Sequence, residues 1–144
     1  MRSFLIDASV AIKWVIDEEG TREALALRSY LLAAPDLLSA ECANILWKKV
    51  RRGEISDEEA GFAAKLLARA DIDLIPMRPL LESATRIAVA LDHPAYDCVY
   101  LAAAEVAGLP FVTADDRLLR KLRQDPTGRF ASRALSLVEA ADAL

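Results

Sequence analysis

The pattern that most restricts the fold of this chain is the alternation of short apolar runs with stretches of helical periodicity. Such alternation is typical of a parallel sheet with helices packed on it. The first run, Ser3–Ile6, predicts a strand that ends at Asp7, and the run Pro110–Thr113 predicts a later strand that leads into Asp115. We therefore expect an α/β fold in which both acids follow the carboxyl ends of strands.

The remaining elements follow from apolar spacing and from cap and stop residues. Helices are predicted over about residues 8–16, 21–32, 40–52 and 95–107, with further helices opening at Ser56, starting at Pro79, and carrying Leu118, Leu119 and Leu122. Strands are predicted at 35–38 and 71–77, and the tail 134–144 suggests an edge strand and a short helix. Because the 144 residues contain no linker or repeat, we expect a single domain, 1–144.

Composition narrows the classes of function. The chain is 54% hydrophobic with a mean hydropathy of +0.21, which excludes disorder and suggests that another chain covers some apolar surface. A net charge of −4 argues against binding nucleic acid by bulk attraction, but not against meeting phosphate through a bound cation. No apolar stretch approaches ~20 residues, so no membrane span is expected. Two isolated cysteines, Cys42 and Cys98, indicate small buried side chains in a reducing, cytoplasmic location.

Asp7 and Asp115 each follow an apolar run and precede a predicted helix. Ligands of open parallel sheets bind at the carboxyl ends of the strands, where these two side chains would lie. Each could instead be only a helix N-cap, a position that favours Asp. The sequence leaves both interpretations open.

Asp97 and Glu41 lie near the starts of two other predicted helices. From Asp97 to Ala104 no other residue is charged, and a carboxylate on a buried helix is rare unless it is paired or binds metal. Glu41 follows Ser39, an N-cap candidate whose capping box would need an acid at the position held by Cys42. A favourable interaction with the helix dipole is the alternative for both acids.

Taken together, the four acids predict a cation site. Carboxylates that converge on one edge of a sheet repel one another unless a cation neutralises them. Oxygen ligands with open positions suit Mg²⁺ or Mn²⁺, and such a site can orient a water and stabilise charge on a phosphoryl group. Because the sequence has no His/Cys cluster, zinc is not expected.

Four short motifs resemble, in order, those of the PIN-domain family. They are FLIDAS at 4–9, SAECANIL at 39–46, HPAYDCVYLA at 93–102 and VTAD at 112–115. Their order, their spacing and the chain length resemble the VapC toxins of bacterial and archaeal toxin–antitoxin pairs, over nearly the whole chain.

This resemblance implies a PIN-like α/β/α sandwich, with a parallel sheet of four to five strands and about seven helices. It also implies Mg²⁺-dependent endonucleolytic cleavage of RNA, with Mn²⁺ able to substitute. The implied partners are an RNA substrate, a VapB-like antitoxin and a second copy in a homodimer.

The resemblance also assigns roles to residues. Asp7 and Asp97 would be the principal metal ligands, and Glu41 and Asp115 would complete the catalytic site directly or through water. The remaining assignments concern side chains around these acids: Ser9 and Thr113 would hydrogen-bond carboxylates or phosphate, and Asp116 could share the role of Asp115 or be only a solvated first-turn residue.

The basic and apolar residues near these motifs have two interpretations each. Arg117 and Arg120 follow Asp115 and are expected either to guide the RNA backbone or to form a solvated helix face. His93, before Pro94, is expected to have a structural role in a turn. The first helix is apolar on nearly every side, so either neighbouring helices bury it or another chain covers it.

Other functions stay open. A catalytically silent PIN fold that serves as a binding or scaffold protein would share the architecture. An aspartate-based phosphatase would need a second Asp where this chain has Ser9, and a receiver domain would need paired early acids and a later Lys. Both fit the sequence less well than a nuclease does.

Overall fold

The fold is built on one parallel sheet. The computed structural model describes residues 2–143, and in this range five strands pair in the order β3-β2-β1-β4-β5, with every pairing parallel. The strands are β1 (Ser3–Ile6), β2 (Leu31–Pro35), β3 (Asp73–Ile75), β4 (Phe111–Val112) and β5 (Ala134–Leu135). The predicted parallel sheet is confirmed.

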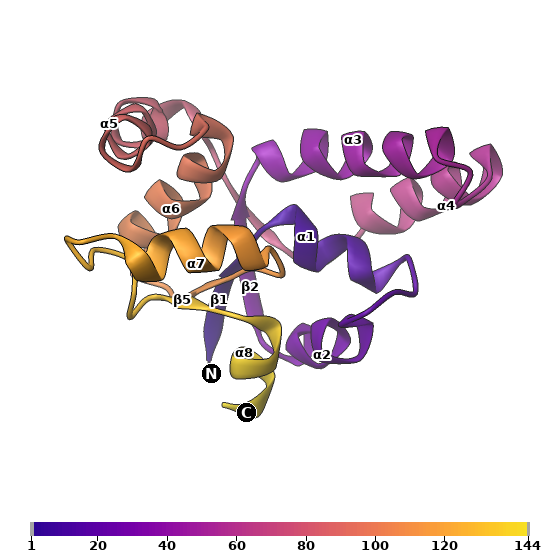
Figure 1. Cartoon of the computed structure of the whole chain (residues 1–144). Helices are drawn as coiled ribbons and strands as arrows, with labels where there is room; N and C mark the ends of the chain where they lie inside the picture. The colour runs from indigo at the N-terminus through magenta and orange to yellow at the C-terminus, as the bar shows by residue number, and fades with distance from the viewer. Residues whose placement is uncertain (1, 144) are drawn as a thin grey trace.

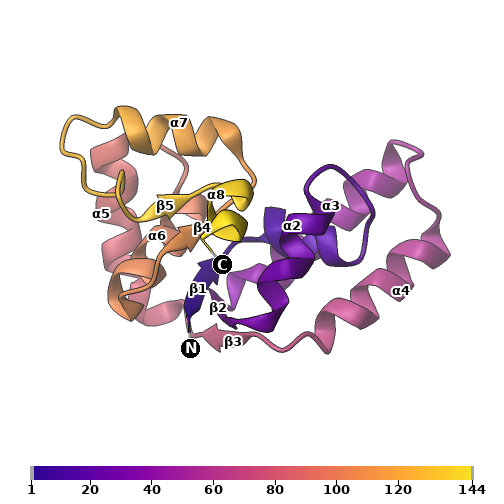
Figure 2. The same cartoon turned by 90° about the horizontal axis from the view of Figure 1, so that it is seen from below.

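Eight α-helices of the described range surround this sheet (Figure 1). They are α1 (Ala8–Ala11), α2 (Thr21–Ala26), α3 (Leu37–Arg51), α4 (Asp57–Ala68), α5 (Leu81–Leu91), α6 (Ala95–Ala107), α7 (Asp116–Gln124) and α8 (Leu137–Asp142). Figures 1 and 2 show α5 and α6 on one side of the sheet and α1 to α4 on the other. The arrangement is the predicted PIN-like α/β/α sandwich.

Helix α6 is the centre of the core. Every side chain from Cys98 to Ala104 is buried, and the helix packs against β1, β2 and β4. It ends at Gly108, whose φ of 67° closes the helix in the left-handed conformation that glycine adopts without strain. The predicted bounds of this helix are confirmed. No helix in the part of the chain that the model describes is long and apolar enough to cross a membrane.

The register of the sheet brings two of the sequence motifs together. Ile6 of β1 pairs with Val112 of β4, so the next residues, Asp7 and Thr113, leave the sheet side by side. On the other flank, Leu5 pairs with Ala33 of β2, and β2 runs on towards α3 and Glu41. Parallel pairing therefore carries three motifs to one edge of the sheet.

Helices α3 and α4 form a hairpin that extends away from the sheet (Figures 1 and 2). The start of α4 has the predicted cap, because Ser56 accepts a hydrogen bond from the Glu59 amide and Glu59 returns one to the Ser56 amide. The start of α3 differs from expectation. Asp36, not Ser39, is its N-cap residue, so Ser39 lies inside the first turn.

The second strand lies earlier than predicted. The structure has β2 at Leu31–Pro35, whereas we expected a strand at 35–38 and a helix that continued to Leu32; α2 with its following 3-10 turn ends at Ser29. Successive residues of β2 from Leu32 to Pro35 are all buried, so both faces of the strand are covered and its sequence is a continuous apolar run. Periodicity cannot separate such a run from a buried helix.

The apolar first helix is covered by this chain itself. The segment is α1 followed by a 3-10 turn at Ile12–Trp14, and Val10, Ala11 and Ile12 are buried. Ile12 packs with Leu46 of α3 and Ala63 of α4. This chain therefore covers the first turn of the segment, whereas Trp14, Val15 and Ile16 are only partly buried, and their covering by another chain stays a prediction.

Candidate active site

Asp7 is a buried carboxylate held by hydroxyl groups. Its side chain is 7% exposed and accepts hydrogen bonds at one oxygen from the amide and the hydroxyl of Ser9, at 3.1 and 2.5 Å. The other oxygen accepts a hydrogen bond from the Thr113 hydroxyl at 2.5 Å. Asp7 is also the N-cap of α1, so the capping role that we had considered is real. Helix capping alone does not require a carboxylate to be buried so deeply, so the cap does not fully explain the position of Asp7.

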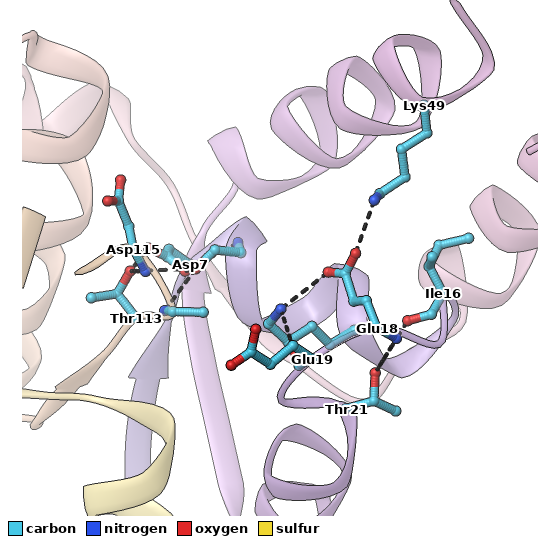
Figure 3. A network of polar contacts seen from close by, with 11 residues as sticks. Asp7, Ile16, Glu18, Glu19, Thr21, Lys49, Thr113 and Asp115 are labelled. Atoms are coloured by element: carbon cyan, nitrogen blue, oxygen red, sulfur yellow. Dashed lines mark hydrogen bonds and ion pairs between the residues drawn. The ribbon is translucent and has the colours of Figure 1, made fainter. Parts of the chain in front are cut away.

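The same hydroxyls join the two loops that follow β1 and β4. The Ser9 hydroxyl accepts a hydrogen bond from the Ala114 amide at 2.9 Å, and the Thr113 hydroxyl accepts one from the Asp115 amide at 3.1 Å. Figure 3 shows Asp7, Thr113 and Asp115 together at this point. The short network fixes the orientation of the Asp7 carboxylate.

Three acids form one electrostatic cluster, which we call the acidic cluster: Asp7, Glu41 and Asp97. Burial, helped by the charges of Asp97 and Glu41, raises the pKa of Asp7 to about 7 against the opposing effect of the Ser9 and Thr113 hydroxyls. Burial also raises the pKa of Glu41, with a further contribution from Asp97. The charge of Asp97 thus disfavours ionisation of both Asp7 and Glu41.

Asp97 lies in the first turn of α6 and is partly exposed, with 32% of its side chain accessible. The α6 residues that follow it, from Cys98 onwards, are buried, whereas Tyr96 before it is exposed, so the carboxylate lies at the rim of the core. His93, four residues earlier, lies with Nε2 2.6 Å from a carboxylate oxygen of Asp97. From the sequence His93 was expected to have only a structural role in a turn, and its contact with Asp97 was not predicted, because His93 precedes the helix.

Asp115 lies apart from the acidic cluster electrostatically. Its carboxylate caps α7 by accepting hydrogen bonds from the amides of Arg117 and Leu118, at 3.0 and 3.1 Å. Its charge is not among the influences that shift the pKa of Asp7. Asp116 is exposed in the first turn of α7. The structure therefore places Asp7, Glu41 and Asp97 where their charges affect one another, and it engages the Asp115 carboxylate as the cap of α7.

Basic residues follow Asp115 along α7. A cavity of about 470 Å³ is lined by His93, Asp115, Arg117 and Lys121 among others. A second cavity of about 560 Å³ shares Arg117 and Lys121 and adds Arg120. The two cavities form a basic path that leads from the start of α7 towards its end.

The donor set suits a hard divalent cation. The acidic cluster offers carboxylate oxygens only, and within residues 2–143 no Lys or Arg side chain forms an ion pair with any of its three members. Among the described residues, however, no three His, Cys, Asp or Glu side chains are arranged so that they could hold a metal ion by themselves. Mg²⁺ tolerates this, because it keeps several waters and takes only one or two carboxylates directly.

Comparison with known proteins agrees with this fold and site. A family model described as "PIN domain" matches residues 4–123. "Ribonuclease VapC3" of Pyrobaculum aerophilum is 29% identical over 121 residues, which cover 81% of this chain and 92% of that protein. The crystal structure of PAE2754 from Pyrobaculum aerophilum is similar with a TM-score of 0.73 and 25% identity, over 99% of this chain and 94% of that one. The chain therefore belongs to the PIN-domain family and is of the VapC type.

Proposed function

We propose that this chain is a Mg²⁺-dependent endoribonuclease that cleaves RNA phosphodiester bonds and acts as the toxin of a toxin–antitoxin pair. The observation that carries the proposal is a buried carboxylate, Asp7, that has two acidic neighbours and no cationic partner among the described residues. The PIN-domain match and the similarity to a protein named as a ribonuclease support the choice of reaction.

In this proposal Asp7 and Asp97 hold the cation, and Glu41 and Asp115 complete the site directly or through water. When bound, the ion would supply charge stabilisation for a phosphoryl oxygen and lower the pKa of a coordinated water. Ser9 and Thr113 fix the Asp7 carboxylate by their hydrogen bonds, so that its oxygens keep one orientation. Mn²⁺ would substitute for Mg²⁺ because both favour oxygen ligands.

The path of the RNA strand is proposed to follow α7. Arg117, Arg120 and Lys121 line the two adjoining cavities, and Asp115 lies at one end of this path. Cations at this position would contact backbone phosphates and bring the scissile bond to the acidic cluster. Asp116 is exposed in the first turn of α7, where an acid is favoured by the helix dipole, so we assign it at most a minor role beside Asp115.

The α3–α4 hairpin is the proposed contact for a VapB-like antitoxin. Trp47 and Phe62, one on each helix, are 53% and 64% exposed, and an apolar cavity of about 220 Å³ lies between the two helices. Apolar side chains gathered in this way are typical of a protein interface. A second copy of the chain in a homodimer is proposed from the family resemblance.

An aspartyl-phosphate mechanism is less well supported. Both Asp7 oxygens already accept hydrogen bonds, and the position two residues later holds Ser9 in place of a general acid. Burial leaves only 7% of Asp7 exposed for attack on a substrate. The geometry favours a carboxylate that positions an ion over one that forms a covalent bond.

The proposal is tested by cleavage of labelled RNA with Mg²⁺ or Mn²⁺ against EDTA. Asp7→Asn and Asp97→Asn are expected to lower the rate by at least about 100-fold, because each removes a charge that the cation needs. Asp73→Asn, an exposed acid on the edge strand β3, is the matched control and should cleave like the wild type. Cleavage that survives EDTA or both site variants would contradict the proposal, and metal uptake without cleavage of any RNA would favour a silent scaffold.

A further inference from the structure

Tyr100 presents a buried hydroxyl with no hydrogen-bond partner. The residue is on α6 and is 1% exposed, and among the buried polar side-chain atoms of residues 2–143 its hydroxyl oxygen alone makes no hydrogen bond. Burying a hydroxyl without a partner costs free energy, and nearly all buried polar groups in proteins are paired. Such an atom in a core helix therefore needs a physical explanation.

The surroundings of this hydroxyl are acidic. Burial raises the pKa of the Tyr100 phenol far above its usual range, and the Glu41 and Asp7 carboxylates raise it further. The phenol in turn acts on Glu41, since it opposes the effect of burial on the pKa of that carboxyl group. The Tyr100 hydroxyl thus lies close enough to Glu41 to affect the pKa of that carboxyl group, but no hydrogen bond joins the two side chains in this structure.

The geometry of α6 explains how Tyr100 reaches the acidic cluster. Residues three apart share a face of a helix, so Tyr100 lies one turn below Asp97 on the same side. Its ring packs against Phe111 of β4, with 6.4 Å between ring centroids, which holds the hydroxyl in place. Glu41 comes from α3 and is only partly buried, so its flexible side chain has more room to turn than the packed ring of Tyr100.

We infer that Tyr100 is a positioning residue, whose hydroxyl donates a hydrogen bond to Glu41 when that carboxylate turns towards a divalent cation held by the acidic cluster. The inference rests on the proposed function. In the metal-free chain the donor is fixed but unused, and ion binding gives it a partner. Groups that orient a ligand of a metal in this way commonly change the metal affinity 10–100-fold when they are removed.

Tyr100→Phe tests this role by two measurements. Calorimetric titration with Mn²⁺ should show an affinity about tenfold weaker than that of the wild type, because Glu41 loses its orienting donor. Urea unfolding of the metal-free variant in EDTA should show stability equal to or above that of the wild type, because the lost hydroxyl had no partner. Tyr30→Phe is the matched control. Tyr30 precedes β2, at the opposite end of the sheet, and should change neither quantity.

Glu41→Gln completes a double-mutant cycle. If Tyr100 acts through Glu41, adding Tyr100→Phe to Glu41→Gln weakens Mn²⁺ binding much less than it does in the wild type. Equal effects in both backgrounds, or unchanged affinity with lowered metal-free stability, would mean that Tyr100 is only a core residue. Failure of the proposed function looks different, because then the wild type itself takes up no Mn²⁺, and both ideas are rejected.

Discussion

Two buried or half-buried carboxylates of this molecule, Glu18 and Asp7, differ in their partners (Figure 3). Glu18 is paired with cations, whereas Asp7 is not. Glu18 forms ion pairs with Lys13 and Lys49, at 3.1 and 2.9 Å. Although burial acts to raise its pKa, hydrogen bonds from the two lysines outweigh burial and lower it. Asp7 has only uncharged donors, the Ser9 amide and the Ser9 and Thr113 hydroxyls, and its pKa is raised to about 7.

The difference shows which carboxylate finds its counter-charge within the chain and which does not. Glu18 ties the loop after α1 to α3 and needs no further partner, so its role is structural. Asp7 is held as firmly, but its hydroxyl donors do not offset burial and the charges of Glu41 and Asp97. A cation from outside the chain would do for the acidic cluster what Lys13 and Lys49 do for Glu18.

The largest effect is expected from Asp7→Asn in metal-free protein. The pKa of Asp7 is about 7 in the folded chain against 3.8 ordinarily, so the folded state binds the proton more tightly. Wild-type stability therefore falls as pH rises from about 4 to about 7, and the variant lacks this fall. In urea unfolding with EDTA, the stability of Asp7→Asn relative to wild type should increase by about 2 kcal/mol between pH 5 and pH 8. A constant difference across this range would show that Asp7 is not strained in the metal-free fold.

Thr113→Val should have the next largest effect. The substitution keeps the shape of a fully buried side chain but removes the hydroxyl that donates to Asp7. The Asp7 oxygen that accepts from Thr113 then has no hydrogen-bond donor, which lowers the free energy of unfolding by about 1–2 kcal/mol at pH 7. Urea titration measures the loss, with Thr85→Val on the exposed face of α5 as a control that should lose less. Equal losses would mean that the Asp7 network contributes nothing specific.

Lys49→Met tests the other half of the comparison and has the smallest expected effect. Removing one of two cations from Glu18 should lower stability by about 1 kcal/mol at pH 7. Because the folded pKa of Glu18 is lowered, this contribution is present above the ordinary pKa and disappears as pH falls through the folded value. Lys48→Met, an exposed neighbour on α3, is the control. Losses of the same size in both variants would refute the structural role of Glu18.

Most of the fold could be predicted from local patterns. The bounds of α6 follow from an apolar run closed by Gly108, and the cap of α4 follows from Ser56 and Glu59. The position of β2 could not be predicted, because a strand whose two faces are both buried shows no alternation of apolar and polar residues. The sequence also could not show whether the apolar first helix was covered by this chain or by another.

The acids of the candidate site could be named from the sequence, but the way they are arranged in space could not be predicted. Strand ends indicated Asp7, and a single charge on an apolar helix indicated Asp97. The N-cap role of Asp115 was one of the two interpretations that the sequence left open, but the sequence could not show that this cap engages its carboxylate beside the acidic cluster. The hydroxyl of Tyr100 was missed because an aromatic residue on a core helix is indistinguishable in sequence from ordinary packing.

The most direct test of the central claim, that the acidic cluster binds a divalent cation, is calorimetric titration of the purified chain with Mn²⁺. Wild type and Glu18→Gln should both take up the ion, since Glu18 already has its lysines. Asp7→Asn and Asp97→Asn should not. Uptake that persists in both site variants, or none by the wild type at millimolar Mn²⁺, would contradict the account.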